Sequence, residues 1–204
     1  MEAFNPASKD VENKMILNTQ SNFFLKGAIK RIILHIGDDP NREGLKETPE
    51  RIIKSWSRLY GGYKQKAEEV LGTVFSEYGN YDEMIILKNI DFFSTCEHHM
   101  LPFYGKAHIA YLPNKKIVGI SKLARLVEMH SRRLQIQERL TSDIANDINR
   151  ILKPKGVAVL VEAQHFCIKA RGIEKINSIM TTNALLGVFR KPEVRAEFFS
   201  LVKE

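Results

Sequence analysis

The sequence predicts an α+β protein, in which an antiparallel sheet is covered by helices on one face and preceded by a helical segment. Three observations support this class. Residues 21–75 carry apolar side chains mainly at helical spacing. From residue 84 onward, β-branched and aromatic runs alternate with two amphipathic stretches, in the order strand, strand, helix, helix, strand, strand. Consecutive strands in pairs favour antiparallel pairing, with the helices gathered on one side.

The N-terminal part divides into a polar stretch and a helical region. Residues 1–20 are polar and show no periodicity, so we expect a flexible segment there. Apolar residues at helical spacing predict a helix over 21–36, and a turn-rich stretch ends it. Thr48 as N-cap and Pro49 in the first turn predict a second helix that stops at Gly61 and Gly62. A short helix is expected over 65–75. The predicted parts are a flexible segment (1–20), a helical region (21–75) and a sheet domain (76–204).

The sheet domain is read from its alternating patterns. Extended runs predict strands over 84–94, 105–113, 156–166 and 176–189, and helical periodicity predicts helices over 121–133 and 137–153. A last amphipathic helix is expected after Pro192.

Composition limits the function classes. The chain has 204 residues with 44% hydrophobic and 27% charged residues, which suits a globular protein with a proper core. No apolar run reaches the ~20 residues of a membrane helix. The N-terminus lacks the pattern of a secretory signal, and two distant cysteines make no disulfide framework, so a cytoplasmic location is expected. The net charge of +7 favours an anionic partner: nucleic acid, phospholipid or a phosphorylated small molecule.

Cysteine and histidine gather in two places. "FFSTCEHHMLPFYG" places Cys96 beside His98 and His99, and "EAQHFCIKARG" places His165 two positions before Cys167. In an extended segment those two positions face the same side. Zinc prefers thiolate and imidazole ligands, and Cys96, His99 and Cys167 would leave its fourth position open to water, as in catalytic zinc sites.

The spacing leaves other readings open. His98 or His165 as a fourth ligand would make the zinc structural, whereas the same two residues beside the metal would serve as acid and base groups. Buried cysteines and histidines without metal, or a Cys–His nucleophile pair, also fit this composition.

A second constellation suits an anion. Ser121 is expected as an N-cap, with Lys122 and Arg125 on the first turns of the same helix, which is an arrangement suited to phosphate. Further cations are Arg171, Arg51 and Lys54. Glu138, in "QIQERL", can accept two hydrogen bonds from an edge such as that of guanine. A solvated basic face, and a surface glutamate paired with Arg139 or Arg133, are the alternatives.

At these residues the sequence resembles GTP cyclohydrolase I. The blocks "FFSTCEHHMLPFYG", "VGISKLARLVE", "RLQIQERLT", "QHFCIKARG" and "NSIMTTNALLGVF" carry the resemblance, with "REGLKETPERI" as an N-terminal signature. It extends from about residue 25 to the C-terminus. Two departures stand out: Ile168 replaces an expected methionine, and Lys169 adds a charge near the site.

The resemblance implies a tunnelling fold, a four-stranded antiparallel sheet with two helices on one face, assembled into a toroidal homodecamer with active sites between subunits. It implies that Cys96, His99 and Cys167 hold Zn²⁺, which activates water for attack on C8 of the guanine ring of GTP. Formate and 7,8-dihydroneopterin triphosphate would be the products, in the first step of tetrahydrofolate or tetrahydrobiopterin biosynthesis. The roles it implies for the remaining residues are proton transfer by His98 and His165, guanine binding by Glu138 and Gln137, and triphosphate binding by Ser121, Lys122, Arg125, Arg171, Arg51 and Lys54.

Two other functions would leave different marks on the sequence. A zinc-stapled basic module that binds nucleic acid would show a closed metal site, but the sequence has no nucleic-acid-binding motif. A tunnelling-fold relative acting on a different pterin or deazapurine would typically lack the complete set of cysteines and histidines present here. We therefore expect GTP as the substrate and neither nucleic acid nor membrane as a partner.

Overall fold

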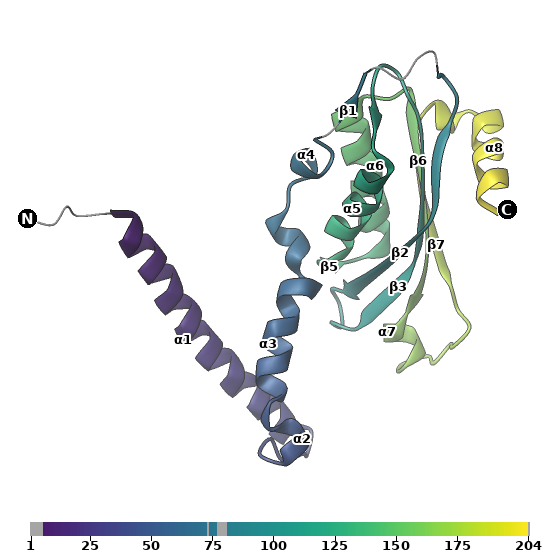
Figure 1. Ribbon diagram of the computed structural model, residues 1–204. Helices are drawn as coiled ribbons and strands as arrows, with labels where there is room; N and C mark the ends of the chain where they lie inside the picture. The colour runs from purple at the N-terminus through teal and green to yellow at the C-terminus, as the bar shows by residue number, and fades with distance from the viewer. Residues whose placement is uncertain (1–5, 73, 77–80, 204) are drawn as a thin grey trace, which may run out of the picture. The chain divides into compact units, whose positions relative to one another are not determined.

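The computed structural model of the protein describes residues 6–72, 74–76 and 81–203 (Figure 1). The chain forms two compact units, Met1–Arg58 and Leu59–Glu204, and each is described by itself. The sequence predicted a boundary at residue 75 instead, and the assignment of a catalytic domain to 76–204 stays a prediction.

The first unit is helical. It contains α1 (Pro6–His35), α2 (Glu43–Lys46) and α3 (Thr48–Leu59). An ion pair between Lys26 and Glu50 joins α1 to α3. The helices predicted at 21–36 and from Thr48 are confirmed. Helix α1 also covers much of the stretch predicted to be a flexible segment; residues 1–5 of that stretch lie outside the described residues, and its flexibility stays a prediction.

The second unit is built on an antiparallel sheet. Its long strands are β2 (Ile85–Cys96), β3 (Pro102–Leu112), β6 (Gly156–His165) and β7 (Met180–Gly187), and each pairs antiparallel with the next. The predicted antiparallel sheet, with two strands before and two after the helices, is therefore confirmed. A two-residue strand, β5 (Leu134–Gln135), adds a parallel edge to β2, so the sheet order is β5-β2-β3-β6-β7.

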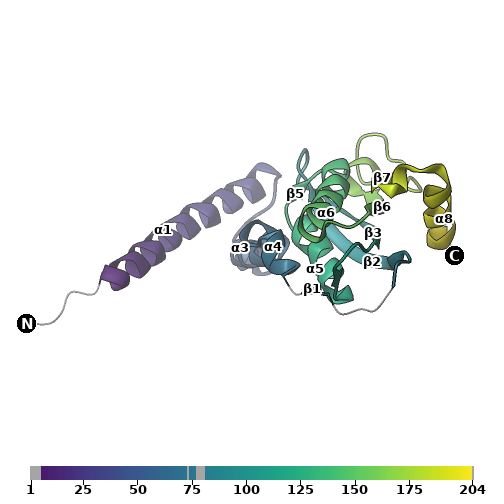
Figure 2. The same cartoon turned by 90° about the horizontal axis from the view of Figure 1, so that it is seen from above.

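Two helices cover one face of this sheet. Helix α5 (Ile120–Ser131) packs on β2, and α6 (Gln137–Leu152) packs on β6 and β7 (Figure 2). Residues at helical spacing form the contact and are fully buried, among them Leu123 and Leu126 of α5 and Leu140, Ile144 and Ile148 of α6. They share one apolar core with Phe92, Phe103 and Ile109 of the sheet.

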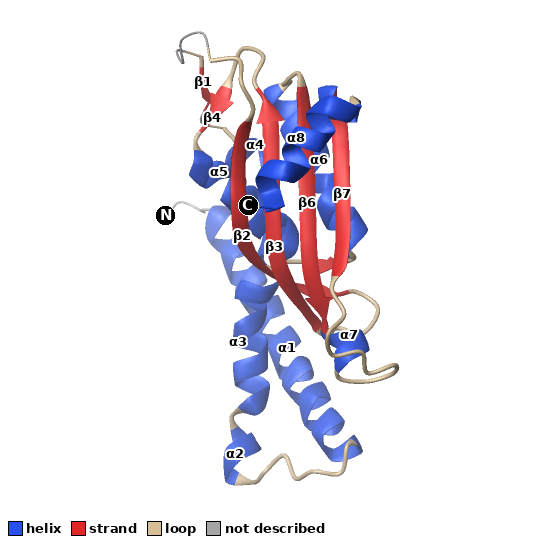
Figure 3. Cartoon of the chain, turned by 90° about the vertical axis from the view of Figure 1, so that its right-hand side faces the viewer, coloured by secondary structure: helices blue, strands red, loops and turns tan. Residues whose placement is uncertain are grey.

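The helix predicted after Pro192 is present as α8 (Pro192–Lys203), and it lies on the opposite face, which the prediction of helices on one face did not include (Figure 3). Phe198 of α8 is fully buried and packs with Phe189 and with Ala110 and Leu160 of the sheet in a second, smaller cluster. The Lys88 ammonium donates a hydrogen bond to the carbonyl oxygen of Leu201 at 2.8 Å, which fastens the end of α8 to β2.

Short elements complete the unit: η1 (Gly61–Lys64), α4 (Ala67–Val70), β1 (Val74–Phe75), β4 (Ile117–Val118), α7 (Phe166–Lys169) and η2 (Val188–Arg190). The short helix expected over 65–75 is present only as α4, and residue 73 of that range lies outside the described residues. Strands β1 and β4 pair as a separate ribbon. Within the described residues, none of the helices combines the length and apolarity that crossing a bilayer requires.

Candidate metal centre and substrate site

Strand register brings the two cysteine segments together. Thr95 at the end of β2 pairs with Pro102 at the start of β3, and Phe103 pairs with His165 at the end of β6. Cys96 and His165 therefore lie at the same end of the sheet. The sequence placed His165 and Cys167 in one extended segment. In the structure β6 ends at His165, and Cys167 is held in the single helical turn of α7.

A tight turn between β2 and β3 presents the histidines. The Cys96 amide donates to the carbonyl oxygen of Leu101, and the Met100 amide donates to that of Cys96, both at 2.8 Å. Met100 closes the turn with a φ of 53°. His98 and His99 lie in the turn and are exposed, and the Nδ1 atom of each is 3.9 Å from the Cys96 sulfur.

Cys96, His99 and Cys167 form a group suited to a metal ion. Their ligand atoms all lie within 4.8 Å of one another, and Cys96 is buried while His99 is exposed. Burial raises the pKa of the Cys167 thiol and the neighbouring Cys96 adds to that effect, whereas Arg171 opposes it. Two thiolates this close repel each other unless a cation lies between them, and sulfur with imidazole nitrogen is the donor set that zinc prefers. The three predicted ligands therefore fit a metal.

His165 is held beside this group. Its ring stacks on Phe103, with ring centroids 4.6 Å apart and planes within 4° of parallel. Its Nε2 atom lies 2.8 Å from Oε1 of Gln137. Burial lowers the pKa of His165, and the nearby carboxylate of Glu138 acts in the opposite direction.

Gln137 and Glu138 begin α6 but differ in environment. Gln137 is 1% exposed, and its amide nitrogen donates to the carbonyl oxygens of Val161 and Met180, both at 3.0 Å. Glu138 is exposed. Arg139 forms an ion pair with Glu97 of the turn, not with Glu138, and Arg133 donates to the carbonyl oxygen of Gly62 at 3.0 Å. The alternative pairing of Glu138 with either arginine is therefore not what the structure has.

The predicted phosphate residues occupy the start of α5, with one correction. The N-cap is Gly119 instead of Ser121, because the helix begins one residue earlier, at Ile120. Ser121 and Arg125 are exposed, and Lys122 is half-buried. The start of α5 follows β4, whereas its end leads into β5, which pairs with Thr95 and Cys96. The metal-binding group therefore lies near the C-terminal end of α5, whereas Ser121 and Lys122 lie in its first turn and Arg125 lies near its middle.

The remaining predicted cations lie in different places. Arg171 follows α7 and is exposed, close enough to Cys167 to influence its pKa. Arg51 and Lys54 lie on α3 in the first unit, where the Arg51 guanidinium donates to Gly44 O at 2.9 Å and to Thr48 Oγ1 at 3.0 Å.

Comparison with known proteins decides the family. Residues 25–203 match GTP cyclohydrolase I. The chain belongs to the GTP cyclohydrolase I family. Membership makes it an enzyme, and the resemblance carried by the CEHH and H-x-C segments is confirmed.

Two relatives illustrate the similarity. GTP cyclohydrolase 1 of Wolinella succinogenes is 52% identical over 180 residues, covering 88% of this chain and 96% of the relative. GTP cyclohydrolase 1 of Chlorobium chlorochromatii is 53% identical over 182 residues, covering 88% of this chain and 81% of that protein. Among solved structures, the archaeosine synthase QueF-Like in the apo form has a TM-score of 0.45 and 18% identity, over 53% of this chain and 97% of that one.

The sequence missed the residues that support the site of this cyclohydrolase. Glu97 lies between Cys96 and His98, and its ion pair with Arg139 fastens the histidine turn to α6. Arg139 in turn donates to Oε1 of Gln135 at 2.9 Å, and Gln135 is buried. The only feature of the sequence that pointed to these two residues was that Glu97 and Arg139 lie within the CEHH and QERL segments. Their pairing was not predictable, because it joins residues 42 positions apart.

Proposed function

We propose that this chain is a zinc-dependent GTP cyclohydrolase I that converts GTP and one water into formate and 7,8-dihydroneopterin triphosphate. The observation that carries the proposal is the group formed by Cys96, His99 and Cys167 beside His165, in a member of this family. The two free thiols of the group suit a reducing, cytoplasmic compartment.

Cys96, His99 and Cys167 would hold Zn²⁺, which needs a fourth ligand to complete its tetrahedron. When bound, the metal supplies Lewis-acid activation of a water at neutral pH. His98, in the exposed turn, and His165, at the end of β6, are the groups that accept and return protons as the imidazole ring opens and formate leaves. Glu138 lies exposed near His165 and would bind the N–H edge of guanine with its two carboxylate oxygens.

The triphosphate site points to more than one copy of the chain. Ser121 and the C-terminal end of α5 are separated by about 15 Å along the helix axis. Ser121 and Lys122 are thus remote from the metal-binding group of their own chain, and together with Arg125 they would serve the site of a neighbouring copy. Arg171 would reach the phosphates from the metal side, and Arg51 and Lys54 from a further copy. This division favours a ring-shaped assembly, which we propose is a toroidal homodecamer of tunnelling-fold subunits.

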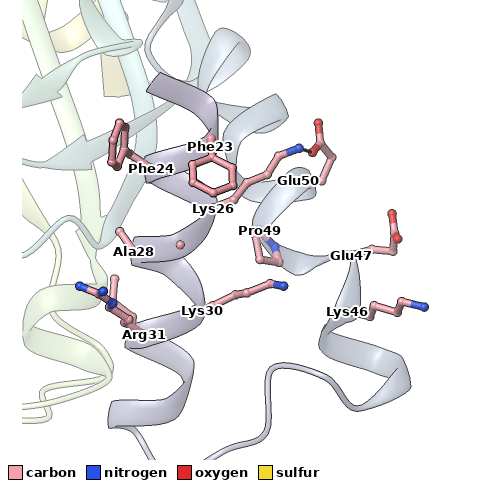
Figure 4. Close-up of a pocket in the computed structure, with 12 residues that line it drawn as sticks. Phe23, Phe24, Lys26, Ala28, Lys30, Arg31, Lys46, Glu47, Pro49 and Glu50 are labelled. Atoms are coloured by element: carbon pink, nitrogen blue, oxygen red, sulfur yellow. Dashed lines mark ion pairs between the residues drawn. The ribbon is translucent and has the colours of Figure 1, made fainter. Parts of the chain in front are cut away.

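The first unit offers a surface for self-association. Phe23 and Phe24 of α1 are 76% and 73% exposed, and they border a hollow of about 1010 Å³ between α1 and the α2–α3 segment (Figure 4). Ile32 and Leu34 of α1 are also exposed. Several large exposed apolar side chains on one helix are typical of a protein interface, and the assembly proposed above supplies a second copy to cover them.

The test is turnover of GTP by the zinc-loaded protein. Formate release and a neopterin that becomes fluorescent after oxidation are the expected products. Zinc-loaded, assembled protein that gives neither product contradicts the proposed function. The alternative nucleic-acid module has no observation in its favour, and a binding experiment with single- and double-stranded DNA is expected to show no specific complex.

A further inference from the structure

Gln137 is oriented without ambiguity by its hydrogen bonds. The side chain is almost completely buried, and its nitrogen lies 3.0 Å from each of two backbone carbonyl oxygens, Val161 O and Met180 O. It also lies 3.2 Å from Thr182 Oγ1. Carbonyl oxygens only accept, so the NH₂ group must face them. The amide oxygen of Gln137 therefore faces His165, and a flipped amide would set its oxygen against two other oxygens.

This orientation fixes the tautomer of His165. An amide oxygen only accepts, so the Nε2 atom of His165, 2.8 Å away, must carry the hydrogen. In the neutral ring Nδ1 is then the free acceptor. Among the described residues no hydrogen-bond partner of that Nδ1 is found. The stack on Phe103 holds the plane of the ring, so both the position and the protonation pattern of the imidazole are set before any ligand arrives.

We propose that Gln137 is a positioning residue that holds His165 in the Nε2–H tautomer, and that it is not a contact to guanine. Nδ1 is then the ring nitrogen left free to face a ligand, while Nε2–H stays on the Gln137 oxygen. The catalytic consequence rests on the proposed function, whereas the tautomer does not. Glu138, the exposed neighbour, is left as the guanine-binding residue of the pair.

The decisive measurement determines which ring nitrogen of His165 carries the hydrogen. In magic-angle spinning NMR of the assembled, zinc-loaded protein with ¹³C,¹⁵N-labelled histidine, the signals of His165 are those lost in His165→Gln. We expect a protonated Nε2 and an unprotonated Nδ1 in neutral His165. A protonated Nδ1 overturns the proposal, whatever the activity of the protein.

The steady-state kinetics of Gln137→Met distinguish a residue that positions His165 from one that binds the substrate. Methionine keeps the volume but accepts no hydrogen bond of comparable strength, so we expect kcat to fall about 10–100-fold, as for other supporting hydrogen bonds around metal sites. KM for GTP and zinc content are expected to stay unchanged. A raised KM with an unchanged kcat would show that Gln137 binds substrate and would overturn the proposal.

Thr141→Val is the matched control. Thr141 is equally buried and bonds Gln137 O and Thr182 Oγ1, both at 2.7 Å, but it has no hydrogen bond to His165. We expect the Nε2–H tautomer and kcat to persist in this variant. If Thr141→Val lowers kcat as much as Gln137→Met, the effect is general loosening of α6 and the proposal fails. Wild-type protein with the expected tautomer but without GTP turnover would contradict the proposed function only.

Discussion

At the scale of single residues, the proposed metal ligands and the proposed proton carriers occupy different positions. Cys96, His99 and Cys167 converge on one point, whereas His165 is engaged by Gln137 and stacked on Phe103. His98 lies at the same distance from the Cys96 sulfur as His99, yet it does not belong to the converging group. A ligand and a proton carrier therefore respond differently to truncation.

We expect Cys167→Ala to lose both the bound metal and turnover, because two remaining ligands hold zinc poorly. His165→Ala should keep the metal and lose turnover by about 10²–10⁴-fold, the usual contribution of a positioned acid–base group. Elemental analysis of the purified variants, with GTP turnover beside it, checks both. Loss of zinc from His165→Ala would show that His165 is a ligand.

We expect His130 to make the free energy of unfolding depend on pH. It is buried, its Nε2 donates to Asp147 at 2.9 Å, and its Nδ1 has no hydrogen bond and lies 3.9 Å from Asp143. Burial lowers the pKa of His130, and the positive charge of Arg133 lowers it further. The hydrogen bond to Asp147 and the negative charge of Asp143 act in the opposite direction. In the unfolded chain a histidine has a pKa near 6.5, whereas the pKa of His130 in the folded chain is lower. The unfolded chain therefore binds more protons below about pH 6.5, and the free energy of unfolding should fall as the pH drops below that value.

His130→Gln should flatten that dependence, because glutamine can still donate to Asp147 and does not titrate. Denaturant midpoints on both sides of about pH 6.5, at one protein concentration, measure the effect. Some dependence should remain, since burial also lowers the pKa of His108. If the free energy of unfolding of His130→Gln depends on pH as steeply as that of the wild type, groups other than His130 cause the loss of stability at low pH.

At the scale of elements, the site depends on the close approach of β3 and β6. A Cβ atom on Gly105 of β3 would lie 1.8 Å from the carbonyl oxygen of Glu162 and 2.7 Å from the Cα of Ala163. Both atoms are β6 backbone, which cannot move aside as a side chain would. Strand β6 leads directly to His165 and Cys167, so any displacement of β6 reaches the metal group.

Gly105→Ala should therefore lower the free energy of unfolding by about 1–3 kcal/mol or more, as overpacking does, and reduce zinc occupancy. Thermal or chemical unfolding and metal content are the measurements. Gly61→Ala is the control, since its Cβ would meet no heavy atom within 4 Å. If Gly105→Ala and Gly61→Ala have equal free energies of unfolding, β3 and β6 can move apart to admit the methyl group without loss of stability.

At the scale of the whole molecule, catalysis is proposed to require assembly. The start of α5 and the metal group lie at opposite ends of one helix, so a single chain does not gather all the predicted contacts to GTP. The basic balance of the chain, with a net charge of +7, is consistent with several triphosphate-binding surfaces in one assembly.

Phe24→Asp should weaken this assembly, because it places a charge in an apolar surface that a second copy is proposed to cover. Sedimentation velocity should show smaller species and GTP turnover should fall with them. Ser21→Asp, which adds the same charge at an exposed polar position of α1, should stay assembled. A Phe24→Asp protein of unchanged size would remove α1 from the interface.

The sequence by itself determined the elements with strong patterns and the chemistry of the candidate metal ligands. Helices α3, α5 and α6 and the long strands were predictable because their apolar residues repeat with one period over many positions. That Cys96, His99 and Cys167 form a candidate metal-binding group was predictable, because few residue types bind metal and their local spacing is restrictive.

The tertiary structure decided what depends on contacts between distant segments. Local patterns do not tell which face of the sheet α8 covers, that β5 adds an edge, or that Arg139 pairs with Glu97. They also do not distinguish Gln137, buried against β6 and β7, from its exposed neighbour Glu138. Periodicity records only how apolar residues repeat along one segment, whereas the partner of a polar group is fixed when separate segments pack together.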